Sequence, residues 1–117
     1  MKEGSIILTP IPQADGQLKN RPALYLRELP PFRDMLVCGI STQVHQAVEG
    51  FDKIIVKDDS DYALSGLVAD SIIRLGFLAV IPRKNVIGSI GSISSKRHAR
   101  LLKQLSKHLE KGIKAGL

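Results

Sequence analysis

Short apolar runs separated by turn-forming residues are the feature of this sequence that most constrains its fold. The runs are rich in Ile, Val and Leu, and Pro, Gly, Asp or Asn residues separate them. They are Ser5–Leu8, Ala23–Leu26, Met35–Ser41, Lys53–Lys57, Ser71–Arg74, Phe77–Ile81 and Val86–Ile90. Many short strands with tight connections predict a compact antiparallel barrel rather than a sheet built from βαβ units. The pairs Pro10/Pro12 and Pro30/Pro31 predict irregular loops.

The C-terminal segment has a different pattern, which predicts one helix. Ser94 or Ser95 can cap its start, and Gly112 can end it after about Lys111. Its apolar face would hold Leu101, Leu102, Leu105 and Leu109, and its opposite face a basic stripe of Lys96, Arg100, Lys103, Lys107, Lys111 and Lys114. We therefore expect a mainly β fold, a small barrel or half-barrel with one amphipathic C-terminal helix laid on it.

The positive charge of the chain is confined to this helical segment. Residues 1–95 contain ten Lys and Arg against ten Asp and Glu, whereas residues 96–117 contain seven basic residues against Glu110 alone. A charged face opposite a leucine face is typical of any solvated amphipathic helix. It also fits RNA or an acidic protein partner, so the charge alone does not decide between these interpretations.

Length and composition limit the domain organisation and the compartment. A chain of 117 residues can bury one core and is too short for two, so we expect a single domain over residues 1–117. No apolar run approaches the length of a membrane span, and the N-terminus lacks the apolar core of a signal peptide. Cys38 is the only cysteine, and its apolar neighbours predict a buried small hydrophobe. We expect a cytoplasmic protein without a membrane partner.

Neither a metal site nor a nucleotide site is indicated. His45, His98 and His108 are not spaced as a ligand set, and there is no CxxC or HExxH motif. The stretch Gly88–Ile93 lacks the Gly-Lys-Ser/Thr ending of a P-loop and does not spell GxGxxG. The sequence therefore predicts no metal and no cofactor.

Polar residues at the ends of predicted strands are the remaining candidates for chemistry. They are Arg21, the cluster Ser41-Thr42-Gln43, and Arg74. The forked guanidinium of arginine matches the oxygens of a phosphate, and a hydroxyl can bind the same phosphate or pass on a proton. These groups would form a phosphate site if the fold brings them together. Otherwise Arg21 is an ordinary solvated loop charge.

Four sequence blocks, in order, resemble the MazF/PemK/Kid family of toxins. The first combines Gly4-Ser5-Ile6-Ile7-Leu8 with Lys19-Asn20-Arg21-Pro22-Ala23-Leu24, and is similar to a family opening that contains an Arg-Pro-Ala/Val-Leu run. The others are Val37–Gln43, which is similar to a strand that ends in Ile-Thr, then Ser71-Ile72-Ile73-Arg74, and Ile90-Gly91-Ser92-Ile93-Ser94 before the helix. Together they span nearly the whole chain.

The resemblance implies an SH3-like barrel that usually forms a homodimer and cleaves single-stranded RNA without a metal. The substrate's own 2′-hydroxyl would attack the adjacent phosphate, leaving a 2′,3′-cyclic phosphate and a 5′-hydroxyl. The resemblance also implies a cognate antitoxin whose flexible tail blocks the RNA groove. By motif match, Arg21 and Ser41 would be catalytic and Arg74 would bind RNA. Thr42 and Gln43, which follow Ser41 in the same polar cluster, are further candidates for binding RNA.

Three positions depart from the family pattern. Ser41 stands where the family has threonine, Gly76 stands where many relatives have an acidic residue, and residues 13–20 lack the histidine of some relatives. An alternative is therefore a non-catalytic binding protein on the same barrel, like the CcdB-type gyrase inhibitors, which act through their C-terminal residues. The basic terminal helix is compatible with that alternative, whereas the Arg-Pro-Ala-Leu run favours the nuclease.

Overall fold

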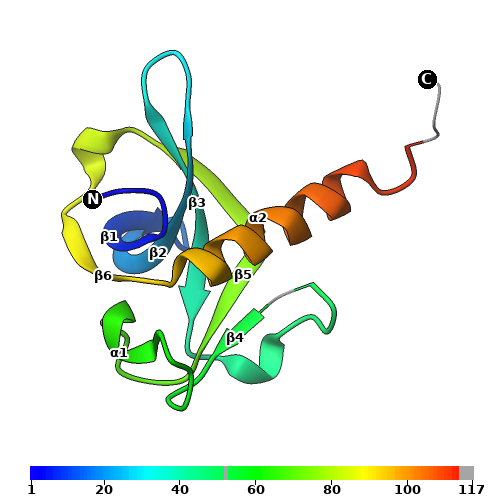
Figure 1. Cartoon of the computed structure of the whole chain (residues 1–117). Helices are drawn as coiled ribbons and strands as arrows, with labels where there is room; N and C mark the ends of the chain where they lie inside the picture. The colour runs from blue at the N-terminus through cyan, green and yellow to red at the C-terminus, as the bar shows by residue number, and fades with distance from the viewer. Residues whose placement is uncertain (52, 114–117) are drawn as a thin grey trace.

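The computed structural model describes residues 1–51 and 53–113, which form a curled antiparallel sheet crossed on one face by a C-terminal helix (Figure 1). Six strands lie in the order β4-β5-β3-β2-β1-β6. The strands are β1 (Ser5–Pro12), β2 (Leu18–Leu29), β3 (Asp34–Ser41), β4 (Lys53–Ile55), β5 (Ser71–Ile81) and β6 (Gly88–Ser92). The helices are α1 (Tyr62–Ser65) and α2 (Ser95–Glu110), with short 3-10 turns at Val44–Gln46 and Arg83–Asn85. The predicted fold class, a mainly β half-barrel with a C-terminal helix, is confirmed.

Two details of the predicted strands were wrong. The runs Ser71–Arg74 and Phe77–Ile81 are one strand, β5, because the chain passes Gly76 in a bulge and continues. Pro10 and Pro12 lie inside β1 rather than in a loop. β6 pairs with β1 only from Ser5 to Leu8, so both prolines lie on a free edge, where a missing N–H removes no ladder hydrogen bond.

The sheet separates two apolar clusters. One lies between the sheet and α2 and contains Ile6, Leu24, Leu26, Cys38, Ile40, Ile55, Ile73, Leu75, Ile93, Leu101 and Leu105. The other lies on the opposite face and contains Ile7, Ile11, Ala23, Tyr25, Met35 and Val37. Because successive side chains of a strand point to opposite faces, Leu24 and Tyr25 belong to different clusters.

Helix α2 begins and ends where the sequence predicts. The Ser94 hydroxyl accepts a hydrogen bond from the Arg97 backbone N–H at 3.1 Å, which caps the helix. Leu101 and Leu105 are buried, but Leu109 is 67% exposed, so its predicted place on the apolar face was wrong. The C-terminal part of α2 extends away from the sheet (Figure 1), and Leu109 packs against neither apolar cluster. In the basic stripe Lys96, Arg100, Lys103, Lys107 and Lys111 are exposed, and Lys114 lies outside the described residues.

A buried ion pair holds the start of α2 against the acidic turn before α1. The Arg97 guanidinium donates to both carboxylate oxygens of Asp61, at 2.8 and 3.0 Å, and to Asp59 at 3.0 Å. Asp61 is only 3% exposed and also accepts from the Ser94 backbone N–H. The hydrogen bonds from Arg97 lower the pKa of Asp61 to about 2.

None of the described helices is long and apolar enough to cross a membrane.

We predict that Asp61→Asn weakens the fold and removes part of its acid sensitivity. A pKa lowered from 3.8 to about 2 corresponds to about 2 kcal/mol at about 1.4 kcal/mol per pKa unit. Because the folded pKa is the lower one, this stabilisation is complete above about pH 5 and is lost as the pH falls from about 4 towards 2. Urea unfolding of the variant at pH 7 should therefore show a loss of about 2 kcal/mol, which shrinks towards pH 2.

Asp58→Asn is the matched control, because Asp58 is an exposed carboxylate of the same turn. The control should stay within about 0.5 kcal/mol of the parent protein. Equal losses in the two variants would contradict the role given to the ion pair.

Candidate functional site

A groove of about 440 Å³ opens on the sheet face opposite α2. Its lining includes all five residues predicted from the sequence, together with others that the sequence analysis did not propose as site residues. The predicted residues are Arg21, Ser41, Thr42, Gln43 and Arg74, and the others include Gln13, Gly39 and Phe77. The fold thus brings together groups that lie more than fifty residues apart in the chain.

The groove exists because β2 and β3 stop pairing. The β2–β3 ladder begins with the pair Ala23 and Gly39. Residues before Ala23 on β2 and after Gly39 on β3 do not pair with each other. Pro22, which has no N–H to donate, occupies the first position of β2 without a partner on β3, although it still pairs with Leu8 of β1. Arg21 and Ser41 therefore stand on the two sides of the gap between the strands.

Arg21 is exposed at the mouth of the groove, and among residues 1–51 and 53–113 its side chain forms one hydrogen bond. Its guanidinium donates to the Gln13 side-chain oxygen at 3.3 Å, and the Gln13 amide donates to the Ile11 carbonyl at 2.9 Å. Gln13 therefore orients the arginine while leaving most of its donors available to a ligand. In the β1–β2 register Arg21 faces Thr9, and Gln13 reaches Arg21 from the turn end of the hairpin, so no local sequence pattern identified Gln13.

Ser41 ends β3 at the floor of the groove. Its hydroxyl accepts a hydrogen bond from the Gln43 backbone N–H at 3.1 Å, so the hydroxyl proton remains free to donate to a ligand. Thr42 and Gln43 follow in the exposed segment that leads to the 3-10 turn at Val44–Gln46. This local turn fixes the side chain of Ser41 and directs the next two residues along the groove.

A bulge in β5 brings Arg74 to the same place. Cys38 pairs with Leu78 but Gly39 pairs with Arg74, so residues 75–77 of β5 have no counterpart on β3. Such insertions reverse the alternation of side chains between the faces. Arg74 and Phe77 consequently both line the groove, although their spacing in a regular strand would place them on opposite faces.

The groove is suited to binding a phosphate and to stabilising negative charge on it. Arg21 and Arg74 supply permanent cations with several donors, and Ser41 adds a hydroxyl. No carboxylate or imidazole is among the described lining residues. The histidines lie elsewhere, with the His98 ring 2.8 Å from the Leu26 carbonyl. In residues 1–51 and 53–113, no three His, Cys, Asp or Glu side chains gather in a way that could hold a metal ion.

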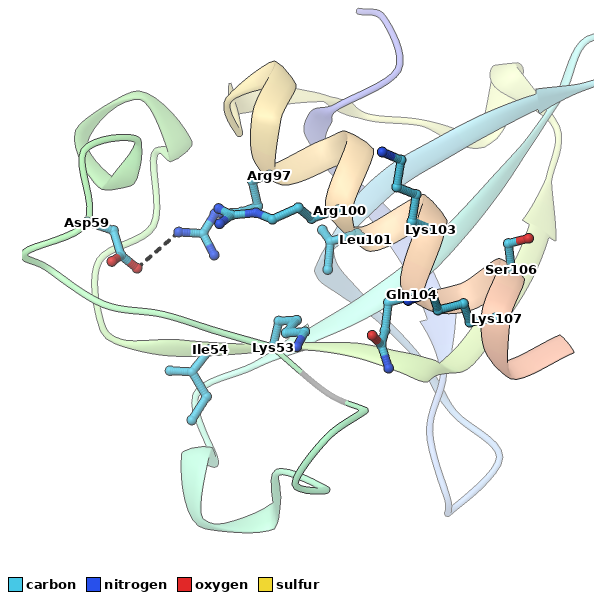
Figure 2. Close-up of a pocket in the computed structure, with 10 residues that line it drawn as sticks. All are labelled: Lys53, Ile54, Asp59, Arg97, Arg100, Leu101, Lys103, Gln104, Ser106 and Lys107. Carbon is cyan, nitrogen blue, oxygen red and sulfur yellow. Dashed lines mark hydrogen bonds and ion pairs between the residues drawn. The ribbon is translucent and has the colours of Figure 1, made fainter. Parts of the chain in front are cut away.

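A second groove, of about 640 Å³, lies between β4 and α2 on the helix-covered side of the sheet (Figure 2). Lys53 and Ile54 line one wall, and Arg100, Leu101, Lys103, Gln104, Ser106 and Lys107 line the other. Arg97 at one end is paired with Asp59. Within the described part of the chain, the other four cations of this groove form no ion pair. It is therefore a cationic surface separate from the groove that holds Arg21.

The curled six-stranded half-barrel with a C-terminal helix has the MazF-like toxin fold. The solved structure of the Mycobacterium tuberculosis toxin MazF-mt6 matches it with a TM-score of 0.64 and 22% sequence identity. The match covers 91% of this chain and 96% of that one. No protein-family model matches the sequence, and no curated protein matches it significantly. The fold expected from the sequence resemblance is thus confirmed by structure.

The exposure of Arg21 predicts that it contributes little to stability. Arg21→Ala should change the free energy of unfolding by less than about 0.5 kcal/mol, because its side chain is solvated and makes one long hydrogen bond. Arg97→Ala, which breaks a buried ion pair, should cost about 3 kcal/mol or more. Urea denaturation measures both. Comparable losses would assign Arg21 a structural role instead.

Proposed function

We propose that the protein is the toxin of a type II toxin–antitoxin system and cleaves single-stranded RNA without a metal. The observation that carries this proposal is the convergence of Arg21, Ser41 and Arg74 in one groove of a MazF-like fold. It is supported by the Arg-Pro-Ala-Leu run, and by the similarity to a protein that is itself described as a MazF toxin.

In the proposed reaction the 2′-hydroxyl oxygen of the substrate attacks the adjacent phosphorus. A bond forms between phosphorus and O2′, and the bond between phosphorus and O5′ breaks, which leaves a 2′,3′-cyclic phosphate and a 5′-hydroxyl. Ser41 relays the proton of the 2′-hydroxyl to solvent water, and the leaving O5′ takes up a proton from solvent water. Arg21 stabilises the charge that develops on the phosphorane, and Arg74 holds the RNA backbone.

Charge stabilisation therefore provides most of the catalysis in this proposal. One preorganised donor aimed at a developing oxyanion is commonly worth a hundredfold or more in rate. The groove has no carboxylate or imidazole among its described lining residues to act as a conventional general base. We accordingly propose a slow endoribonuclease.

The proposed partners follow from the same groove. Single-stranded RNA would occupy it during cleavage, and the flexible tail of a cognate antitoxin would block it at rest. A second copy of the chain would complete a homodimer. The proposed place of action is the cytoplasm, where the RNA substrate is found.

A non-catalytic toxin or binding protein, like the CcdB-type gyrase inhibitors, is the second candidate. The groove between β4 and α2 favours it, because Lys53, Arg100, Lys103 and Lys107 present an unneutralised cationic surface to a partner (Figure 2). The two candidates use opposite faces of the sheet, so substitutions on each face separate them.

We predict that the purified protein cleaves a long RNA in the presence of EDTA. Sequencing and end analysis should find 2′,3′-cyclic phosphate and 5′-hydroxyl ends. Arg21→Ala should lower the rate at least a hundredfold, since it removes the principal charge-stabilising donor. Arg21→Lys should be nearly as slow, because it keeps the charge but loses the planar fork that binds two phosphate oxygens.

Ser41→Ala should reduce the rate less than Arg21→Ala, and Ser41→Thr should be tolerated because it retains the hydroxyl. Activity that disappears with EDTA and returns with a divalent ion would exclude the proposed mechanism. Full activity in Arg21→Ala would move the site away from this groove.

We predict that the helix surface contributes only long-range attraction to RNA. Lys103→Gln combined with Lys107→Gln should leave the cleavage sites unchanged and weaken the salt dependence of cleavage, because the substitutions remove two cations on the far side of the sheet. Cleavage patterns at several salt concentrations measure this. A folded double variant that no longer cleaves would place the site on α2.

A further inference from the structure

Phe77 is a large aromatic side chain in a groove whose predicted functional residues are all polar. Its ring borders the same hollow as Arg21 and Arg74, and the residue is 40% exposed. Phe77 is not one of the predicted site residues, and it is not part of either buried cluster of the sheet. An aromatic ring in this position requires a reason other than core packing.

The backbone around Phe77 is built to hold the ring against β3. The bulge at residues 75–77 turns Phe77 towards the groove, and Gly39 lies beneath the ring. A Cβ atom at position 39 would lie 3.0 Å from Cδ1 of Phe77, closer than normal packing allows. One face of the ring therefore lies directly against the backbone of Gly39, where a side chain would displace it.

A cationic group lies next to the aromatic ring, a combination that is common in proteins that bind single-stranded nucleic acid. The Arg74 guanidinium carbon lies 6.0 Å from the centre of the Phe77 ring, at the outer limit of a cation–π contact. Single-stranded RNA presents phosphates along its backbone and unpaired bases beside them. Proteins that bind such strands combine a cationic track with aromatic rings on which bases stack.

We infer that Phe77 is a stacking platform for one unpaired nucleobase of the RNA whose phosphate is bound by Arg21 and Arg74. This inference rests on the proposed function and adds a base subsite to it. The ring contacts the base and takes no part in bond breaking. Stacking is available to every base, so the platform positions the strand and favours purines, which offer the larger surface.

Exposed aliphatic residues on the same strand provide the competing explanation. Leu78 is 40% exposed and Val80 is 55% exposed, so Phe77 could belong to an apolar strip that contacts a second protein chain. A stacking platform distinguishes RNA with bases from RNA without them, whereas a protein contact does not. The experiment is built on that difference.

The test measures binding of two uncleavable oligonucleotides by fluorescence anisotropy. One is a fluorescein-labelled 2′-O-methyl oligoadenylate, and the other is an abasic oligomer with the same number of phosphates. Phe77→Leu should weaken binding of the oligoadenylate about fivefold to a hundredfold and leave binding of the abasic oligomer unchanged. Phe77→Trp should restore the oligoadenylate affinity. Val80→Ala, a matched change on the same strand, should alter neither.

A second variant guards against misfolding of the first. Gly39→Ala keeps Phe77 but pushes its ring aside, so it should also weaken oligoadenylate binding selectively. Thermal melting of each variant checks that the fold persists. In cleavage assays Phe77→Leu should raise KM more than it lowers kcat.

The outcomes separate this inference from the proposed function. Three results for Phe77→Leu would overturn the platform even if the parent protein cleaves RNA. They are an equal loss of binding for both oligomers, unchanged binding of the oligoadenylate, or a molecular mass in light scattering that differs from that of the parent. Loss of cleavage in Arg21→Ala together with selective stacking loss in Phe77→Leu supports both. A parent protein that binds the oligoadenylate selectively through Phe77 but cleaves no RNA would refute the nuclease and retain the platform.

Discussion

One helix can cover only one face of a six-stranded sheet, and the arrangement of this protein follows from that constraint. Helix α2 closes the face that carries Leu24 and Leu26. Among the described residues no α-helix covers the other face, so the sheet must curl to bury Tyr25 and Val37 against its own strands and the segment before β6. Register shifts in the ladders of β1, β2 and β5 provide the local bending that such curvature needs. The groove lies where this closure ends, beyond Ala23 and Gly39.

The same bending explains why the groove carries the groups that it does. A regular β5 would send Arg74 and Phe77 to opposite faces, and the bulge puts both beside Gly39. At Gly76, where the family resemblance leads one to expect an acidic side chain, a Cβ atom would lie 3.3 Å from Phe51. The position faces a packed aromatic ring, so a carboxylate there would be crowded against it. A groove that relies on guanidinium groups is consistent with that local packing.

The sequence was informative wherever a local pattern decides the outcome. The apolar runs predicted most strands, and the Ser94 cap and the leucine spacing predicted α2, because these features depend on neighbouring residues only. Motif matches located Arg21, Ser41 and Arg74, which the structure places together. Phe77 and Gln13 could not be found in this way. The position of Phe77 depends on the β5 bulge, and that of Gln13 on the register across a hairpin, and both are set by tertiary pairing. Leu109 shows the converse error, since its spacing is helical but the sheet ends before it.

The separation of the two grooves by the sheet has a consequence for how the chain can change over generations. Side chains more than about 10 Å apart that share no partner contribute almost independently to free energy. The two grooves have no lining residue in common, so substitutions among Arg100, Lys103 and Lys107 can accumulate without altering Arg21 or Ser41, and the reverse also holds. Such a chain can evolve to bind a new partner protein through the surface of α2 while the groove that contains Arg21 keeps the same chemistry. The two faces of the sheet can therefore evolve independently of each other.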